Sequence, residues 1–265
     1  MATRSLLLCP PDFFDIRYEI NPWMNRDRAI DHARAKDQWQ RLCGILQNLD
    51  APLHIVKTHP NWPDMVFTAN AGLVLGRRVI RSNFRHPERM GEAPHYQRWF
   101  EQSGYDVVLL PEGIAFEGEG DALFCGETLF CGGEFRTDVA AHDWLRENSG
   151  CDVVSLKLLN PHFYHLDTCF CPLGEGIVAW YPDAFDEESQ REIRERIRDG
   201  MVVTEEEAMR FACNAVVLGR DVILPEGCPT FRADLRARGF ESHEVPMDEF
   251  MKAGGACKCL VLQLK

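Results

Sequence analysis

Two cysteines with one lysine between them stand near the end of the sequence, in the segment "GGACKCLVLQLK". Cys257 and Cys259 could bind a metal, form a disulfide, fill a core or act as a nucleophile. Structural zinc sites favour cysteine pairs with wider spacing, whereas one residue separates this pair and the similar pair Cys169 and Cys171. In a strand, two side chains at this spacing point to the same face. We therefore do not expect a zinc site.

The sequence contains eleven cysteines, an odd number, in a chain of 265 residues. A small disulfide scaffold is much shorter, so we expect most of the thiols to be reduced and buried in a cytosolic protein. Core packing is the expected role of six of them: Cys9, Cys43, Cys125, Cys131, Cys151 and Cys228.

A histidine and three carboxylates provide groups for acid–base chemistry. His165 and Asp167 lie two residues apart in "NPHFYHLDTCF", and Glu117 and Asp121 lie in "FEGEGDALF". The glycines beside Glu117 let the backbone approach a ligand closely, although an ordinary turn would use them as well. A histidine among carboxylates is suited to general acid/base catalysis. Carboxylates that meet a cysteine and a histidine describe a site for a cationic, electrophilic carbon, and a guanidinium group has that chemistry.

A repeated pattern gives these residues equivalent positions along the chain. Segments that begin at Asn70, Asp121, Asp167 and Asn214 each consist of a polar residue, an apolar run, a turn with glycine and a second apolar run. This pattern is typical of a β-hairpin. A fifth copy begins at Cys259 and ends after one strand, and the five starting points are 51, 46, 47 and 45 residues apart. Such regular spacing indicates an internal repeat.

Each hairpin is followed by a predicted helix and a short apolar strand. The helix in "VAAHDWLRENSG" precedes "DVVSLKL", for example, and a longer helix predicted over residues 26–49 precedes "LHIVK". The N-terminal "SLLLCP" is the strand that would complete the fifth copy and close a ring. In a closed ring the five starting residues would meet at one end of the axis and form the rim of a site. For Asn214 we favour the simpler role of capping the start of a strand.

These motifs resemble those of the pentein, or guanidine-modifying, superfamily, which contains arginine deiminases, dimethylargininases and amidinotransferases. The segments "FTANAG", "EGEGD", "HLDT" and a terminal "GG" followed by a cysteine occur in the family order and cover nearly the whole chain. The resemblance implies an α/β fold, the five-bladed pseudo-symmetric α/β-propeller, which agrees with the fivefold repeat. We expect residues 1–265 to form a single catalytic domain, without the C-terminal, ornithine-processing domain that some relatives carry.

The resemblance also implies roles for individual residues. Cys259 matches the nucleophile, His165 the general acid/base, and Glu117 and Asp167 the carboxylates that bind the guanidinium group. Asp121 matches a second acidic position, which helps to orient the site.

Further positions are assigned to the substrate. Arg89, in "NFRHPERMGE", resembles the residue that binds the substrate α-carboxylate, and Arg85 is the second choice for that role. A solvated surface arginine is an equally good interpretation of Arg89. Phe67, at the start of "FTANAG", and Asn21, in "EINPWM", are expected substrate contacts. Strand periodicity does not distinguish Cys257 from Cys259. The family motif matches Cys259, so we expect Cys257 to be only a neighbour of the nucleophile.

One departure from the pattern indicates a particular activity. Deiminases and dimethylargininases usually carry aspartate where this chain has Asn70, and this variant resembles the arginine dihydrolases, which convert arginine to ornithine, carbon dioxide and two molecules of ammonia. A carboxylate only accepts hydrogen bonds, whereas an amide accepts and donates and can therefore hold a guanidinium or a ureido group. We predict a cysteine-dependent arginine dihydrolase that acts through a covalent thiouronium intermediate and needs no metal or organic cofactor. Hydrolysis that stops at citrulline, from arginine or methylated arginine, is the alternative.

Composition limits the partners. The formal net charge is −12, which argues against nucleic acid or an anionic membrane as the main partner. It also disfavours the ribosome-binding relatives of the superfamily, which need a basic surface and no Cys/His pair. The N-terminal apolar stretch is too short for a signal peptide, and no run approaches the roughly 18 apolar residues of a membrane span. We expect a cytoplasmic enzyme with a small-molecule substrate, and a homo-oligomer is compatible with the sequence.

Overall fold

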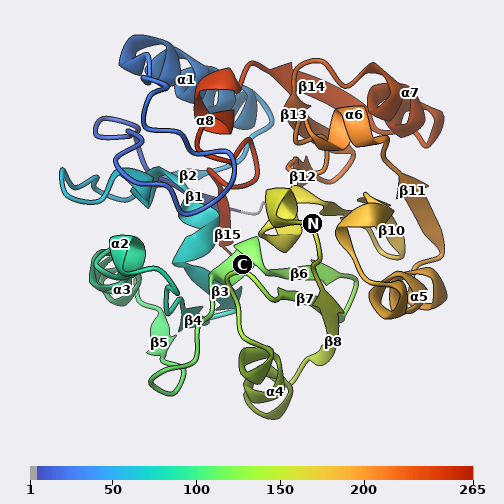
Figure 1. The fold of residues 1–265 in the computed structure, drawn as a ribbon, viewed down its shortest axis with the longest axis horizontal. Coiled ribbons are helices and arrows are strands. Elements are labelled where there is room, and N and C mark those ends of the chain that lie inside the picture. Colours follow the sequence, from blue (N-terminus) through green and yellow to red (C-terminus); the bar gives the residue numbers. More distant parts are fainter. Residues whose placement is uncertain (1–4, 265) are drawn as a thin grey trace.

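Five small sheets form a ring, and helices surround it on the outside (Figure 1). The computed structural model describes residues 5–264. Within that range every sheet has three strands: an antiparallel hairpin, and a third strand that pairs in parallel with the second strand of the hairpin. A helix connects the second strand to the third in each unit. This arrangement confirms the predicted five-bladed α/β-propeller.

Four of the blades are continuous in the chain, and each has the order strand, strand, helix, strand. The first two consist of β3 (Gly72–Leu75), β4 (Arg78–Arg81), α3 (Ala93–Gln102) and β5 (Asp106–Val108), followed by β6 (Ala122–Cys125), β7 (Thr128–Gly133), α4 (Val139–Asn148) and β8 (Asp152–Lys157). The next two consist of β9 (Phe170–Gly174), β10 (Ile177–Trp180), α5 (Glu187–Arg196) and β11 (Asp199–Val202), followed by β12 (Val216–Leu218), β13 (Asp221–Pro225), α7 (Pro229–Ala237) and β14 (Glu241–Val245). Three short helices lie in connections: α2 (Pro87–Met90), α6 (Glu205–Ala208) and α8 (Asp248–Met251).

The fifth blade joins the two ends of the chain. It contains β15 (Leu262–Leu264), β1 (Ser5–Leu8), α1 (His32–Asn48) and β2 (Leu53–Ile55). Strand β1 pairs antiparallel with β15 and parallel with β2, so the N-terminal strand takes the place of the second strand of the hairpin. The predicted closure of the ring by "SLLLCP" is therefore confirmed.

Local sequence signals set the hairpins and the helix ends. Each of the four continuous hairpins turns through two residues, one of which is a glycine with positive φ, as tight hairpin turns require: Gly76, Gly126, Gly176 and Gly219. Helix α1 begins at His32, six residues later than predicted, because the Asp31 side chain accepts a hydrogen bond from Arg34 N and caps the helix there. None of the helices in residues 5–264 has the length and apolar composition needed to cross a membrane.

Apolar side chains fill the space between each helix and its sheet. In the second blade, Ala141 and Leu145 of α4 are fully buried and pack in one cluster with Leu129 of β7 and Val153 of β8. Burying a side chain of leucine size contributes about 1.5–3 kcal/mol. This packing holds the inner strands, and the turns that precede them, in fixed positions around the axis.

Candidate active site

Short turns place the five repeat-equivalent residues at one end of the ring. Three turns are 3₁₀-helical and contain or adjoin Asn70, Asp121 and Asp167: η2 (Thr68–Ala71), η3 (Gly118–Gly120) and η5 (Leu166–Thr168). Asn214 and Cys259 lie in turns before β12 and β15. All five side chains are buried.

A narrow pocket collects most of the predicted site residues. Six of them line it: Asn21, Phe67, Asn70, Arg89, His165 and Cys259. The other three lie directly behind lining side chains: Glu117, Asp121 and Asp167. Sequence reasoning missed five further lining residues: Met24, Asp64, Arg136, Tyr164 and Ala253.

Cys259 is 2% exposed, and its sulfur contacts two side chains. The thiol donates to Asp167 Oδ2 at 3.3 Å, and Asn214 Nδ2 donates to the sulfur at 3.0 Å. Burial raises the pKa of the Cys259 thiol well above its usual value, and the neighbouring Asp167 carboxylate raises it further. In this arrangement the thiol is neutral at pH 7, so a ligand that brings positive charge and engages Asp167 would activate it.

Cys257 and Cys259 lie in a turn, so the prediction that they share one face of a strand is wrong. Strand β15 begins only at Leu262, and a turn lets nearby side chains point in different directions. Cys257 is fully buried in an apolar cluster and does not line the pocket, whereas Cys259 does. Among the cysteines assigned to the core, Cys151 is half-buried and the other five are buried.

The cysteines are free thiols, and all eleven fall within the described residues. In that same part of the chain, no group of three histidine, cysteine, aspartate or glutamate side chains is placed to hold a metal ion.

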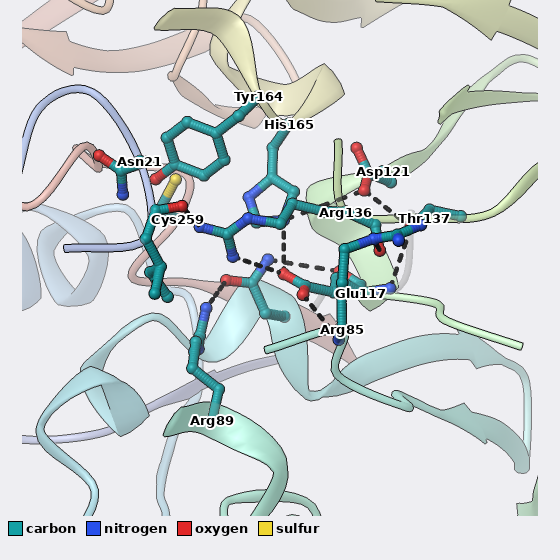
Figure 2. A network of polar contacts seen from close by, with 12 residues as sticks. Asn21, Arg85, Arg89, Glu117, Asp121, Arg136, Thr137, Tyr164, His165 and Cys259 are labelled. Atoms are coloured by element: carbon teal, nitrogen blue, oxygen red, sulfur yellow. Dashed lines mark hydrogen bonds and ion pairs between the residues drawn. The ribbon is translucent and has the colours of Figure 1, made fainter. Parts of the chain in front are cut away.

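His165 is buried and fixed by a carboxylate. Its Nε2 lies 2.8 Å from Glu117 Oε2 and 3.9 Å from Asp121 Oδ2 (Figure 2). A carboxylate only accepts hydrogen bonds, so Nε2 carries the hydrogen and donates to Glu117. The other ring nitrogen, Nδ1, is then the one that can exchange a proton with a ligand.

Both oxygens of Glu117 are engaged beneath the pocket. Oε2 also accepts from Arg136 Nη1 at 3.1 Å, and Oε1 accepts from the backbone N–H of Arg85 at 3.3 Å (Figure 2). Burial by itself raises the pKa of Glu117, but Arg136 and His165 outweigh it, and the pKa of Glu117 falls well below its usual value. The sequence assigns Glu117 to the guanidinium group; in the structure its Oε2 lies against His165 Nε2, where it can orient the imidazole.

Asp121 also lies behind His165 and does not line the pocket. Its Oδ1 accepts from the backbone N–H of Leu166 at 3.0 Å, and its Oδ2 accepts from the Thr137 hydroxyl at 2.7 Å. Burial raises the pKa of Asp121 to about 6. These contacts hold the backbone next to His165 and give Asp121 no free oxygen for a ligand.

Two buried carboxylates each keep one oxygen without a hydrogen-bond partner among the described residues. Asp167 uses Oδ2 for the Cys259 thiol, Asp64 uses Oδ2 for the Tyr18 hydroxyl at 3.0 Å, and Oδ1 is unpaired in both. Burial raises the pKa of both side chains, to about 7 for Asp167. Buried polar atoms are normally hydrogen-bonded, so the two oxygens indicate where the N–H groups of a ligand would bind. Sequence reasoning missed Asp64, although a charged residue inside the apolar run "WPDMVF" was an available signal.

Arg89 lines the pocket and is only 3% exposed, so its interpretation as a solvated surface arginine is wrong. Its guanidinium donates to both oxygens of Glu92 at 2.9 and 2.8 Å, to Asn70 Oδ1 at 2.8 Å and to one backbone carbonyl. These bonds use four of its five N–H donors. The reserve, Arg85, is one-third exposed, pairs with Asp138 and does not line the pocket.

Arg136 is the second buried arginine of the pocket, and it lies outside every motif of the sequence. It is 2% exposed and lies over the Tyr164 ring, with 4.6 Å between its guanidinium carbon and the ring centroid. Its bonds to Glu117 and to Ile20 O use two of its five donors. Arg136 therefore has more capacity than Arg89 to bind an anionic group.

Asn70 is 2% exposed and bridges two parts of the site. Its Oδ1 accepts from Arg89, and its Nδ2 donates to Glu117 O at 3.3 Å. One lone pair and one N–H remain, so the amide can both accept from and donate to a ligand. A Cβ on Gly120 would overlap the Asn70 amide nitrogen and lie 3.3 Å from His165 Cγ, which explains a glycine at this position.

Asn214 does not cap its own strand, so the capping interpretation is wrong. Its side chain is fully buried and reaches two turns of other blades, where it contacts Cys259 and the backbone carbonyl of Asp167. The tertiary arrangement, which the sequence does not display, sets these partners.

Polar contacts close the pocket from the N-terminal side. Asn21 Nδ2 donates to Ala253 O at 3.1 Å, its Oδ1 accepts from Trp23 N at 2.9 Å, and the Tyr164 hydroxyl donates to Gly254 O at 2.7 Å. The cavity volume is about 10 Å³, close to what one water molecule needs. A ligand the size of an amino acid therefore requires part of the wall to move.

Carboxyl groups outnumber guanidinium groups among the buried side chains that line or directly adjoin the pocket. Four carboxylates face two guanidinium groups: Asp64, Glu117, Asp121 and Asp167 against Arg89 and Arg136. In surroundings with little water, such an excess favours a cationic ligand. The two arginines offer a separate place for an anionic group at the other end of the same ligand.

A five-bladed α/β-propeller with a buried cysteine and histidine at one end of its axis defines a pentein-type protein. The sequence model of one family, eukaryotic N,N dimethylarginine dimethylhydrolase, matches residues 16–265. The chain belongs to this family.

Curated relatives and solved structures extend the comparison. The chain is 45% identical over 264 residues to the bifunctional arginine dihydrolase/ornithine cyclodeaminase ArgZ of Synechocystis sp., covering 98% of this chain and 37% of that protein. It is 38% identical over 262 residues to the N(G),N(G)-dimethylarginine dimethylaminohydrolase of Mycobacterium tuberculosis, covering 99% of this chain and 86% of that one. A crystal structure of the N-terminal domain of ArgZ, a cysteine-to-serine variant bound to substrate, superposes with a TM-score of 0.96 at 44% identity, covering 99% of this chain and 98% of the other.

Proposed function

We propose that the protein is an arginine dihydrolase that converts arginine and two water molecules to ornithine, carbon dioxide and two molecules of ammonia. The observation that carries the proposal is the pair of unpaired carboxylate oxygens, on Asp64, which lines the pocket with Cys259 and His165, and on Asp167, which lies directly behind Cys259. The arginine dihydrolase named among the relatives supports it, although the chain spans only 37% of that protein's length.

The two ends of the pocket suit the two ends of arginine. A guanidinium group has five N–H donors, and the free Oδ1 atoms of Asp64 and Asp167 can each accept one in a charge-assisted bond. The substrate α-carboxylate binds Arg136, with the remaining donor of Arg89 beside it. The sequence assigns the carboxylate to Arg89, with Arg85 as a reserve; the free donors of Arg136 favour Arg136 together with Arg89.

Substrate access requires the pocket wall to open, because its volume is far below that of arginine. The segment with Asn21 and Met24 is the wall best placed to move. It carries no helix or strand, and the hydrogen bonds that hold it to the rest of the wall, and that opening would break, include Asn21 to Ala253 O, Trp23 to His162 O and Arg136 to Ile20 O. Reclosure would place the Asn21 side chain against the bound substrate.

Substrate binding would activate the nucleophile. The guanidinium cation takes the Asp167 carboxylate as its partner, and positive charge then replaces negative charge beside the Cys259 sulfur. Both changes lower the pKa of a thiol whose pKa is raised in the unliganded arrangement. The Cys259 thiol gives its proton to Nδ1 of His165, and the resulting thiolate attacks the guanidinium carbon and forms a C–S bond.

His165 would then transfer protons in two steps. Protonated at Nδ1, it gives that proton to the departing nitrogen, and the C–N bond breaks to release ammonia and leave a thiouronium group on Cys259. Neutral His165 next removes a proton from water, which attacks the same carbon. The added hydroxyl group gives its proton to solvent as the C–S bond breaks, Cys259 returns as a thiolate, and a ureido group, that of citrulline, remains in the pocket. Glu117 holds the imidazole in the required orientation throughout.

A second cycle would act on the retained ureido group. Cys259 attacks its carbon, a second ammonia leaves with a proton from His165, and a carbamoyl group stays on the sulfur. Water releases it as the carbamate of ornithine, which loses carbon dioxide. Asn70 makes the second cycle feasible, because its spare N–H can donate to the ureido oxygen and its spare lone pair can accept from a ureido N–H.

Hydrolysis of dimethylarginine to citrulline and dimethylamine is the second candidate. The family model and the Mycobacterium tuberculosis relative favour it. The amide at position 70 argues for the dihydrolase, since a reaction that stops at citrulline has no need of a donor for the ureido oxygen.

The test is to incubate the protein with L-arginine and, separately, with N(G),N(G)-dimethylarginine, and to quantify ornithine, citrulline, ammonia and dimethylamine. Ornithine with two equivalents of ammonia supports the proposal. Citrulline with one equivalent, or dimethylamine from the methylated substrate alone, contradicts it. Cys259→Ser serves as the blank. We further propose that the reaction takes place in the cytoplasm, where the many thiols would remain reduced.

A further inference from the structure

One side chain next to the nucleophile has no role in the steps above. Asn214 lies in the turn before β12, is fully buried, and contacts Cys259 with both ends of its amide. Its Oδ1 accepts from the backbone N–H groups of Cys259 and Ala256, both at 3.1 Å. Its Nδ2 donates to the backbone carbonyl of Asp167 at 3.1 Å and to Cys259 Sγ at 3.0 Å.

These partners fix which way the amide points. Backbone N–H groups can only donate and a backbone carbonyl can only accept, so Oδ1 must face Cys259 N and Ala256 N, and Nδ2 must face Asp167 O. One N–H of Nδ2 goes to that carbonyl, and the other is held against the sulfur. All four hydrogen-bonding positions of the Asn214 side chain are therefore used, and the amide cannot rotate without losing three backbone bonds.

We propose that Asn214 is a positioning residue that donates a fixed hydrogen bond to the Cys259 thiolate and so makes the thiolate easier to form and to expel. The inference rests on the proposed role of Cys259 as the nucleophile. A sulfur that carries negative charge is a better acceptor than a neutral thiol, so the bond strengthens when the proton leaves. The donor is already in place, and no reorganisation is needed at that moment.

The partner on the other side of the sulfur changes during the reaction, whereas Asn214 does not. Asp167 accepts from the thiol at 3.3 Å before substrate binds and turns to the guanidinium group afterwards. The same N–H of Asn214 would also face the sulfur each time a C–S bond breaks and the thiolate leaves. It would therefore act once in each of the two cycles.

Comparison with the equivalent position of another blade shows what asparagine adds. Asp121 holds the neighbouring turn through Oδ1, which accepts from Leu166 N at 3.0 Å. An aspartate at position 214 would accept from the backbone in the same way. The feature that only the amide supplies is the donor, and it is the donor that meets Cys259.

Other charged groups also surround the sulfur, and a test must leave them unchanged. Lys258, the residue before Cys259, is buried and pairs with Glu119 at 2.9 Å. The remaining titratable neighbours share the pocket or contact the sulfur: Asp64, Arg89, Arg136, Tyr164, His165 and Asp167. A substitution at position 214 replaces none of these side chains, but it removes the hydrogen bond that Asn214 donates at Asp167.

The experiment measures the rate at which iodoacetamide alkylates Cys259 from pH 6 to 10, without arginine. Mass spectrometry of the peptide that contains Cys259 gives the rate, and Cys259→Ser gives the background. The reagent reacts with the thiolate, so at each pH below the raised pKa of Cys259 the rate reports the fraction of Cys259 that is thiolate. The variants are Asn214→Ser, whose hydroxyl is too short to reach the sulfur, and Asn214→Asp, which keeps the acceptor and replaces the donor with an oxygen. Asn61→Ser, at an exposed site in the connection before η1 (Pro63–Val66), is the matched control.

We expect both Asn214 variants to move the curve to higher pH by about one unit or more, which is roughly a tenfold slower reaction at pH 7.5, with the larger shift for aspartate. Asn61→Ser should follow the parent. If the alkylation rates of Asn214→Ser coincide with those of the parent at each pH, the proposal is overturned, and the role of Asn214 is only to hold the backbone of the two turns together. If circular dichroism shows that Asn214→Ser does not fold, the alkylation rate of Asn214→Asp tests the proposal in the same way. The measurement needs no substrate. The role of Asn214 can therefore be refuted while the proposed function stands, and the proposed function can be refuted while the role of Asn214 stands.

Discussion

Replacing Asn70 with aspartate exchanges one nitrogen for one oxygen in the pocket and separates the two halves of the proposed reaction. The variant should still accept arginine, because a further carboxylate favours a guanidinium group. It should release citrulline early, because the ureido oxygen loses its donor and meets an oxygen instead.

The contacts of Asn70 set the size of the effect. The oxygen of the new carboxylate that replaces Oδ1 keeps the Arg89 guanidinium at 2.8 Å, so part of the added charge is neutralised. The other oxygen would face Glu117 O, which now accepts from Nδ2 at 3.3 Å, and this contact becomes repulsive. A buried oxygen left without a donor costs about 1–3 kcal/mol. Because Arg89 remains in place, we take the lower part of that range, about 1–2 kcal/mol, or roughly five- to thirtyfold weaker retention of citrulline.

The assay is the ratio of citrulline to ornithine released from arginine, measured at several times for the parent and the variant. We expect the ratio to rise by roughly five- to thirtyfold in Asn70→Asp. Asn61→Asp adds the same charge at an exposed position of the preceding connection and should leave the ratio unchanged. A ratio that stays low in Asn70→Asp would refute the role of the amide even if the protein made ornithine.

Two further predictions test the nucleophile and the packing around it. Cys259→Ser should lower turnover by at least about a thousandfold without loss of fold. Cys257 lies outside the pocket, so Cys257→Ser should keep most of the activity. The reverse outcome would mean that Cys257, and not Cys259, is the nucleophile. Gly120→Ala should lower kcat/KM at least about tenfold and destabilise the protein by about 1–3 kcal/mol, because the added Cβ has no space beside the Asn70 amide. Gly44→Ala in α1 should do neither, because no atom lies within 4 Å of the position of its Cβ. Kinetics and thermal unfolding of both glycine variants decide this, and equal behaviour would contradict the packing argument.

The fold was predictable because each blade repeats the same local signals. Apolar runs, a turn glycine at the same place and a helix that ends near glycine recur in four copies, and regular spacing shows that they are copies. The error in the start of α1 arose from local chemistry. Asp31 caps the helix at a point that the apolar pattern before it does not mark.

The site was only partly predictable, because its residues come from separate turns that meet only in the folded ring. Motif residues such as His165 and Cys259 stood out, but Arg136 lies in an ordinary polar stretch, and only its burial beside Glu117 makes it notable. The sequence also could not show that both oxygens of Glu117 are occupied. That fact depends on His165, Arg136 and the backbone of Arg85, which come from separate parts of the chain, and it is why we propose Asp64 in place of Glu117 as the partner of Asp167 in binding the guanidinium group.

The most direct measurement of the central claim follows the guanidino carbon itself. L-arginine labelled with ¹³C at that carbon is incubated with the protein, and ¹³C NMR spectra are recorded over the course of the reaction. We expect the label to pass to bicarbonate and carbon dioxide while ornithine forms, with little free citrulline at any time. A label that stops in the ureido carbon of citrulline, or that stays in arginine, would contradict it.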